Sequence, residues 1–407
     1  MEAGIAPTRV SKYRWVILFS IFPMIVSTEI MWLSLAPVSS SAQEFYGVDA
    51  MSVNILSVSY MLMFIVFTVP ASWAIDRIGY RPSLIVGALL TSVFGVVRAA
   101  FANDFAIVLA AQFAIAIGQP FLLNISTKVP ANWFPANERS TAAGILTMAQ
   151  YVGFAVPMLI SPILVEQRGI AYTMWVFAGI AVASAVVSVA CTKERPPTPP
   201  PGPVAVKEDF SVPSIRKLFA NRAYLRVLIV CFISMGIFNT VLTVLETILL
   251  PNGITSSEAG VIGALFVVAG VIGAVALPVL SDRMRARIPF FVCSIIVLIP
   301  AYFGFALLHS FAALAGIAAM AGFMIMGVAP ILFQHGSEVA YPVQEGTSLG
   351  IILLMGQISG VLFVYLFEQM RELSGSALVP MLLIVVATIA ELPIVRGMRE
   401  SNLNGRS

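Results

Sequence analysis

The chain has 407 residues, of which 59% are apolar and 11% are charged. Soluble domains have about 45–50% apolar and about 25% charged residues, so this composition excludes a disordered protein, a nucleic-acid binder and a soluble enzyme. The net charge of +3 adds little, and the composition predicts a membrane protein. The cysteines Cys191, Cys231 and Cys293 lie far apart in apolar segments, so we expect packed thiols and neither disulfides nor a metal site.

The chain contains twelve continuous apolar runs, each near the length of about 20 residues that a membrane-spanning helix needs. Continuous runs predict helices, because the strands of a membrane barrel alternate apolar and polar residues. The first run follows a polar start and exceeds the ~7–15 apolar residues of a cleavable signal, so we expect an uncleaved span. The predicted spans are 15–39, 51–75, 82–101, 105–127, 140–164, 170–191, 225–250, 258–280, 288–308, 311–333, 348–368 and 376–396.

Lysine and arginine are unevenly distributed among the predicted loops. Of the 23 basic residues, 20 fall on the side of the two termini, and only Arg98, Arg168 and Arg371 fall on the other. Cytoplasmic loops of membrane proteins carry the excess of positive charge. We therefore expect a multi-pass protein of the cell membrane (plasma or inner membrane) with both termini in the cytoplasm.

A proline-rich polar stretch, 192–221, separates the sixth span from the seventh. Such a composition is typical of an extended linker. The predicted organisation is a six-helix bundle over 1–191, a cytoplasmic linker over 192–221 and a second six-helix bundle over 222–407.

The two halves of the chain repeat short motifs at offsets of 206 or 207 residues. Three motifs recur in corresponding places. Phe134-Pro135 and Glu138 correspond to Tyr341-Pro342 and Glu345, and Gln150 and Gly153 correspond to Gln357 and Gly360. Asp76-Arg77 corresponds to Asp282-Arg283. Matches in three equivalent places indicate a parallel internal repeat, which is the organisation of major facilitator transporters.

The loop over residues 72–81, SWAIDRIGYR, resembles the cytoplasmic signature G-x-x-x-D-R-x-G-R-[RK] of the major facilitator superfamily, with Ser72 in place of glycine and Tyr80 in place of arginine. This resemblance implies an all-α membrane fold of 12 transmembrane helices in two pseudo-symmetric six-helix bundles. It also implies a cytoplasmic latch between the bundles, although a solvated, positively charged turn is an alternative. The predicted gate and latch residues are Asp76, Arg77, Arg81, Glu138, Asp282, Arg283, Glu338 and Glu345.

A closer resemblance, spread over most of the chain, is to the FLVCR-related transporters of haem, choline and ethanolamine. It is carried by Trp32, 45–48, 59–62, 133–142 and 267–270, and most strongly by 322–357. In that family an aromatic cage and amides hold choline, which implies substrate contacts for Trp32 and Gln357. The chain departs from the family at Asn239, where the family has tyrosine, and at Tyr151, where it has glutamine. Because one aromatic residue of the cage is missing, cation–π recognition is weaker, which implies a related but different substrate.

Several polar residues fall within the predicted spans. Glu29 lies 15 residues after Arg14, about 22 Å along a helix, and a carboxyl group at that depth indicates a pathway, a proton site or a counter-charge. The alternatives are a neutral glutamic acid bonded to a neighbouring helix, plain packing for Trp32, interhelical bonds for the glutamines and a rim or gate role for Glu246. The predicted substrate-binding residues are Glu29, Trp32, Gln119, Gln150, Tyr151, Asn239, Glu246 and Gln357.

The middle of the predicted spans contains no lysine or arginine, which favours a cationic, zwitterionic or neutral solute over an anion. There is no phosphate-binding loop and no catalytic constellation, so we expect neither an enzyme nor a bound cofactor. The favoured function is secondary active or facilitative transport of a small organic solute by alternating access, with Glu29 coupling protons, in a monomer. The alternatives are a proton-driven exporter of drugs or metabolites, whose antiporter signature is represented only by Gly153 and Pro157, and a transporter-like receptor.

Overall fold

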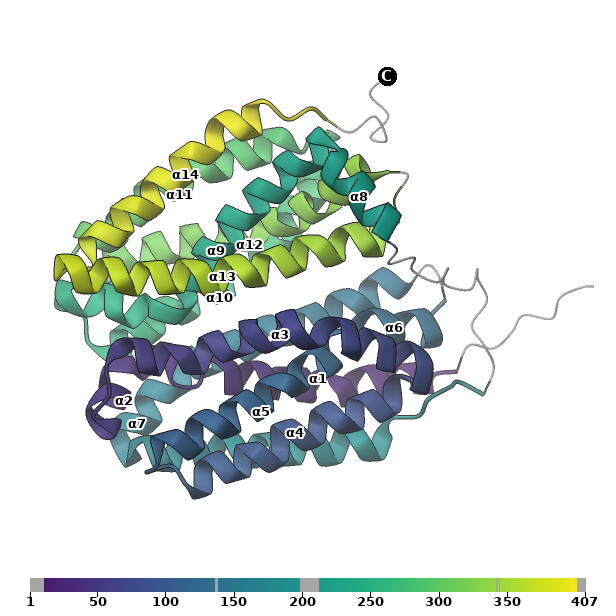
Figure 1. Cartoon of the computed structure of the whole chain (residues 1–407), viewed down its shortest axis with the longest axis horizontal. Coiled ribbons are helices and arrows are strands. Elements are labelled where there is room, and N and C mark those ends of the chain that lie inside the picture. Colours follow the sequence, from purple (N-terminus) through teal and green to yellow (C-terminus); the bar gives the residue numbers. More distant parts are fainter. Residues whose placement is uncertain (1–10, 136–137, 198–211, 342, 344, 401–407) are drawn as a thin grey trace, which may run out of the picture. The chain divides into compact units, whose positions relative to one another are not determined.

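The computed structural model describes residues 11–135, 138–197, 212–341, 343 and 345–400, and every regular element in these ranges is a helix (Figure 1). The elements are α1 (Tyr13–Leu33), η1 (Ala36–Val38), α2 (Ser39–Tyr46), α3 (Ala50–Ile78), α4 (Tyr80–Ala100), α5 (Phe105–Leu123), α6 (Ile125–Trp133), α7 (Arg139–Cys191), α8 (Val212–Ala220), α9 (Arg222–Leu249), η3 (Leu250–Asn252), α10 (Ser256–Met284), α11 (Ile288–Leu307), α12 (Phe311–Ala340), α13 (Glu345–Ser374) and α14 (Leu378–Arg396).

Eleven helical stretches of the described residues are long and apolar enough to cross a membrane. One of them, Thr141–Cys191, contains two of the twelve predicted spans, because Gly169 has φ 82° and ψ 174° and interrupts the helical geometry of α7. Glycine adopts this backbone conformation without a side-chain clash. The twelve predicted spans therefore all correspond to helical segments.

Several helix ends follow directly from local sequence. The side chains of Asp104 and Asn221 accept hydrogen bonds from the first backbone amides of α5 and α9. Thr255 and Glu258 form a capping box at the start of α10. Between α2 and α3, hydrogen bonds from Ser52 hold the pKa of Asp49 below its usual range. These caps satisfy amides that have no partner within the helix.

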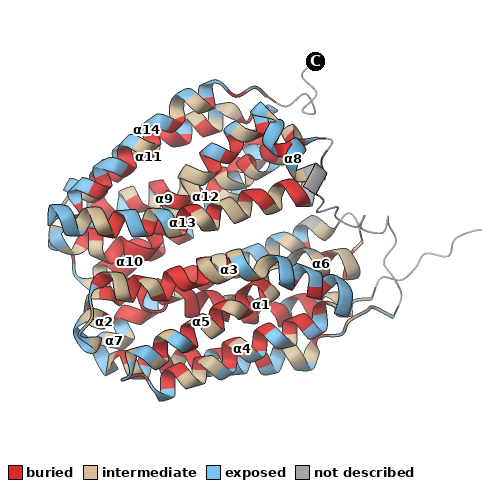
Figure 2. Cartoon of the chain, viewed as in Figure 1, coloured by how far each residue is buried: buried red, intermediate tan, exposed pale blue. Residues whose placement is uncertain are grey.

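The outer face of the helices is apolar, as a membrane solvent requires. In α4 the exposed positions include Val86, Leu89 and Val93, whereas Leu84 and Ala88 are buried. Figure 2 shows buried and exposed residues alternating along this helix. Exposed residues at a spacing of three and four form one stripe, which contacts acyl chains in a bilayer.

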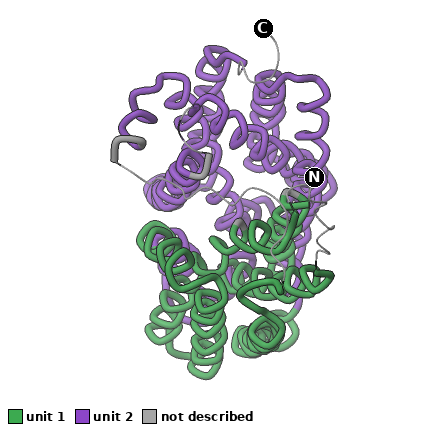
Figure 3. The backbone as a smooth tube through the Cα atoms, turned by 90° about the vertical axis from the view of Figure 1, so that its right-hand side faces the viewer, with its two compact units in different colours: residues 1–34, 63–157, 164–206 green, residues 35–62, 158–163, 207–407 purple. Residues whose placement is uncertain are grey.

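The chain divides into two compact units (Figure 3). Unit 1 comprises residues 1–34, 63–157 and 164–206, and unit 2 comprises residues 35–62, 158–163 and 207–407. The second unit thus includes η1, α2, the first part of α3 and a short segment of α7, whereas the sequence assigns all of 1–191 to the first bundle. The two-bundle boundaries stay a prediction.

Each unit has its own apolar core. The core of unit 1 includes Ile17, Leu84, Leu122, Trp133 and Leu146. The core of unit 2 includes Tyr224, Phe291, Leu332, Ile352 and Val395.

The end of the predicted linker differs from an extended segment. Residues 212–220 form helix α8, because Leu218 is buried in the core of unit 2 and Ile215 packs against it, three residues apart on one helical face. The preceding part of the predicted linker, 198–211, lies outside the described residues.

Candidate functional site

The structure brings together Glu29 and Gln119, two of the predicted substrate residues of unit 1. The Nε2 atom of Gln119 in α5 lies 3.3 Å and 3.2 Å from the two carboxyl oxygens of Glu29 in α1 and donates to them. Glu29 is 1% exposed and Gln119 is 5% exposed. Among the described residues, no basic side chain forms an ion pair with Glu29, so its hydrogen-bond partner is a neutral amide.

Gly153 of α7 provides the space for Glu29. A Cβ atom at position 153 would lie 2.5 Å from the Cβ of Glu29 and 2.8 Å from the backbone oxygen of Val26. These separations are shorter than any ordinary carbon contact. Only glycine at this position lets α7 approach α1 at the level of the buried carboxyl group.

Aromatic side chains gather one turn further along α1. The ring of Trp32 packs edge-on against Phe154 at 5.3 Å between centroids, and Phe154 lies 6.1 Å from Tyr151. Trp32 is buried, and Gln150 and Tyr151 are half-buried. Sequence analysis identified Trp32 and Tyr151 but missed Phe154, whose position three residues after Tyr151 on one helix face was the available signal. Rings grouped in this way offer π faces to a cation.

In unit 2, the predicted residue Asn239 lies against α13. Its Nδ2 atom donates to the backbone oxygen of Gly356 at 3.3 Å, and a Cβ atom at Gly360 would lie 2.7 Å from that same Nδ2. Gln357 is half-buried on the same helix. The repeat offset of 207 pairs Asn239 with Trp32 and Gly360 with Gly153. In each unit, one of these glycines packs against a helix that carries predicted substrate-binding residues, α1 for Gly153 and α9 for Gly360.

Glu246 occupies a different environment from the other predicted substrate residues. Its carboxylate accepts hydrogen bonds from the Ser40 backbone amide at 3.0 Å, from the Ser40 hydroxyl at 2.7 Å and from the Ser256 hydroxyl at 2.6 Å. Ser40 lies in the first turn of α2, so Glu246 caps that helix from α9. This geometry favours a structural role over substrate contact.

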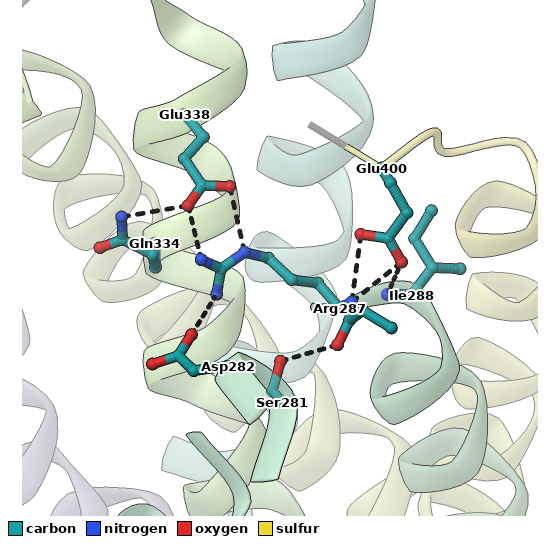
Figure 4. Close-up of polar contacts among 8 residues, drawn as sticks. Ser281, Asp282, Arg287, Ile288, Gln334, Glu338 and Glu400 are labelled. Atoms are coloured by element: carbon teal, nitrogen blue, oxygen red, sulfur yellow. Dashed lines mark hydrogen bonds and ion pairs between the residues drawn. The ribbon is translucent and has the colours of Figure 1, made fainter. Parts of the chain in front are cut away.

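A buried ion pair organises the loop between α10 and α11 in unit 2 (Figure 4). The guanidinium group of Arg287 contacts the Glu338 carboxylate of α12 through Nε at 3.0 Å and Nη2 at 2.5 Å. Asp282 lies 3.7 Å from Arg287 Nη1, and Gln334 donates to Glu338 at 3.2 Å. Asp282 and Glu338 were predicted as latch residues, whereas Arg287 was not singled out.

Three of the other predicted latch residues, Asp76, Arg77 and Glu138, have partners within unit 1. In unit 1, Asp76 pairs with Lys128 of α6, and Glu138 pairs with Arg14 at 3.0 Å. The guanidinium group of Arg77 lies 5.1 Å from the centre of the Trp73 ring. Arg283 in unit 2 is exposed, and the side chain of Glu345 lies outside the described residues. The interdomain role of these residues stays a prediction.

A repeated carboxylate cap, missed by sequence analysis, links the end of each half to its third long helix. Glu194 accepts hydrogen bonds from the backbone amides of Tyr80 at 3.1 Å and Arg81 at 2.8 Å, at the start of α4. Glu400 accepts them from Arg287 at 2.9 Å and Ile288 at 3.0 Å, at the start of α11. The two carboxylates are 206 residues apart and the two pairs of amides are 207 residues apart, so the internal repeat extends to these contacts. Applying the repeat offset to Glu194 would have identified Glu400 from the sequence.

Two further buried polar clusters were also missed. In unit 2, Glu368 is fully buried, accepts a hydrogen bond from Asn54 at 2.9 Å and pairs with Arg371 at 2.7 Å. In unit 1, the buried guanidinium group of Arg98 contacts the Gln112 side chain at 2.5 Å. The described residues contain no group of three or more His, Cys, Asp or Glu side chains that could hold a metal ion.

Comparison with known proteins places the chain among membrane transporters. A sequence profile of the Major Facilitator Superfamily matches residues 13–364. Solute carrier family 49 member A3 of Danio rerio is 30% identical over 377 residues, covering 89% of this chain and 79% of that protein. The choline/ethanolamine transporter FLVCR2 of Homo sapiens is 26% identical over 395 residues, covering 90% and 74%. These relatives confirm the resemblance to the FLVCR-related branch.

The fold is also that of a solved transporter. A bacterial homologue of the human lysosomal transporter Spinster superposes with a TM-score of 0.75 at 16% identity, covering 97% of this chain and 98% of that one. This likeness confirms the predicted all-α fold of two pseudo-symmetric bundles. With the profile matching most of the sequence, the chain belongs to the major facilitator superfamily, a family of multi-pass membrane transporters of small solutes and not of enzymes.

Proposed function

We propose that this transporter moves a small organic solute, cationic, zwitterionic or neutral, by alternating access and that Glu29 couples the movement to protons. The observation that carries the proposal is the Glu29 carboxyl group, buried in a membrane-spanning helix and bonded to the Gln119 amide. A buried intramembrane acid is costly, and such acids characteristically serve transport pathways or proton relays.

The substrate class follows from the chemistry around Glu29. The carboxylate offers a counter-charge, and Trp32, one turn away, offers an aromatic face, a combination that suits an amine or a quaternary ammonium group. FLVCR2 is named for choline and ethanolamine. Because Asn239 and Tyr151 depart from the family's choline residues, we propose a related amine-bearing solute.

The other predicted residues complete the proposal. We assign substrate orientation to Gln119, Gln150 and Tyr151 in unit 1 and to Asn239 and Gln357 in unit 2. Their amides and hydroxyl group provide neutral donors and acceptors. We further propose that both termini lie in the cytoplasm of a cell-membrane protein, because the loops on the terminal side carry most of the basic residues. We propose a monomer as well, in which a single chain supplies all of the assigned substrate residues.

The test is a thermal-shift screen of the detergent-purified protein against amines, choline-like cations, amino acids, sugars and organic acids at two pH values. We expect an amine-bearing solute to stabilise the wild type but neither Trp32→Ala nor Glu29→Gln. The matched controls are Trp175→Ala and Glu44→Gln, because both side chains are exposed. Stabilisation by anions alone, or loss of stabilisation in the controls, would contradict the proposed site.

A further inference from the structure

A shallow groove in unit 1 runs along the first turns of α1 and the last turns of α7. It has a volume of about 390 Å³ and is lined by Trp15, Val16, Phe19, Ser20, Val187 and Cys191. The rings of Trp15 and Phe19 stack at 6.3 Å between centroids and form one wall. The single hydroxyl group in the lining, on Ser20, donates to the backbone oxygen of Ile17 at 2.8 Å. The groove therefore presents an apolar surface.

The groove opens outward from unit 1. Val16 is 45% exposed, Phe19 is 58% exposed and Val187 is 45% exposed. In a chain with membrane-spanning helices, exposed apolar side chains contact lipid acyl chains. Acyl chains are as apolar as these side chains, so the groove alone does not select one phospholipid over another. Selection depends on the polar end of the groove.

The polar end of the groove carries positive charge. Lys12 directly precedes α1, and Lys193 follows Cys191 by two residues; both are exposed. The Nζ atom of Lys193 lies 4.7 Å from the centre of the Tyr13 ring, which places the ammonium group beside the start of α1. Within the described part of the chain, neither lysine forms an ion pair.

The neighbouring acidic groups have partners other than these two lysines. Glu138 pairs with Arg14 at 3.0 Å. The Glu194 carboxylate keeps its negative charge next to Lys193, but it accepts hydrogen bonds from the amides at the start of α4 and forms no ion pair with Lys193 in the described structure. Trp15 lines the groove three residues after Lys12, and indole rings characteristically anchor helices at the membrane interface. The arrangement is an apolar groove with an aromatic wall and two ammonium groups without ion-pair partners in the described structure at one end.

We propose that this groove is a binding site for a phospholipid with an anionic headgroup. One acyl chain would lie along Trp15, Phe19 and Val187, and the headgroup would contact Lys12 and Lys193. Because lysines near a membrane surface attract anionic lipids, we expect about a fivefold preference for the anionic headgroup per lysine. This inference does not depend on the transported solute or on Glu29.

The test is native mass spectrometry of the full-length protein in detergent, with phosphatidylglycerol and phosphatidylcholine of identical acyl chains in competition. We expect phosphatidylglycerol to be preferred by the wild type and the preference to be lost in the double variant Lys12→Gln/Lys193→Gln. The double variant Arg216→Gln/Lys217→Gln is the charge-matched control, because both residues are exposed on α8. It removes the same charge and should keep the preference.

A photoreactive phosphatidylglycerol locates the site. We expect cross-links in peptides containing residues 13–20 and 187–193, reduced when Val187→Trp fills the groove. Lys12→Arg/Lys193→Arg, which keeps the charge, should retain the preference and guards against misfolding in the glutamine variant. Equal binding of the two lipids, equal loss in the α8 control, or cross-links confined to other helices would overturn the proposal.

Discussion

Gly153 of α7 packs against Glu29 of α1 so closely that a Cβ atom at position 153 would lie 2.5 Å from the Cβ of Glu29. The same helix carries Gly144, around which nothing lies within 4 Å of an added Cβ. An added methyl group would therefore collide with the helix of the buried carboxyl group at Gly153 and with nothing at Gly144.

Gly153→Ala is expected to reduce stability by about 1–3 kcal/mol, because overpacking forces α1 and α7 apart. The displacement should also reduce transport, since it moves Glu29. Gly144→Ala should be neutral or slightly stabilising, because alanine is the better helix former. Thermal unfolding of both purified variants in the same detergent checks the difference. Equal effects would show that the close approach at Gly153 is unimportant.

Glu29→Gln is expected to uncouple transport from a proton gradient. Glutamine resembles the neutral carboxyl group in shape and retains an oxygen that can accept a hydrogen bond from Gln119. Uptake into proteoliposomes should therefore respond to an imposed pH gradient in the wild type and not in the variant, while solute exchange without a gradient persists. Glu44→Gln, an exposed substitution in α2, should respond as the wild type does. A variant that still follows the gradient would exclude Glu29 as the proton carrier.

Breaking the Arg287–Glu338 pair is expected to cost about 3–5 kcal/mol. Removing Arg287 leaves the buried Glu338 without a cation, and removing Glu338 leaves the buried Arg287 with only a longer contact of 3.7 Å to the exposed Asp282. Arg287 is 7% exposed and has a second acidic neighbour in Asp282. Unfolding by denaturant in detergent micelles should show the loss for Arg287→Ala and Glu338→Ala and a coupling energy in the double variant. Arg283→Ala, which removes an exposed charge from the same loop, should change stability by less than about 0.5 kcal/mol.

Glu246→Ala is expected to lower stability by about 1–2 kcal/mol without changing the affinity for solute, because it uncaps α2. The measurements are the thermal midpoint and the solute-induced shift, each compared with the exposed control Glu44→Ala. Reduced affinity at unchanged stability would instead restore the sequence prediction that Glu246 contacts substrate.

The parts of the fold that follow from hydrophobicity were predictable. The spans were found because a helix must satisfy its backbone within lipid, and that requirement leaves long apolar runs in the sequence. The internal repeat aligned Gly153 with Gly360 before either environment was known. In the structure, both glycines lie against a predicted substrate residue, Glu29 and Asn239 respectively.

Contacts at helix ends were less predictable. Sequence alone gives the depth of Glu246 but not its contact with Ser40 at the start of α2, and its substrate role stays a prediction. Arg287 resembled any other cytoplasmic arginine, since its burial depends on the approach of α12. Glu368 was overlooked because Asn54, its partner, lies more than 300 residues away in the chain.

The caps by Glu194 and Glu400 determine when, during synthesis of the chain, α4 and α11 each gain an acceptor for their first amides. The amides at the start of α4 gain their acceptor only after translation has passed Glu194, and those of α11 only after it has passed Glu400. Once the first half of the chain has been translated, the residue that caps α4 is present, and no residue of the second half is required for this cap. Shortening the chain by its last eight residues, in contrast, would remove the acceptor from α11 and leave α4 unaffected. In either half, a truncation just before the capping carboxylate would thus remove the acceptor at the start of a helix that lies far from the cut in the sequence.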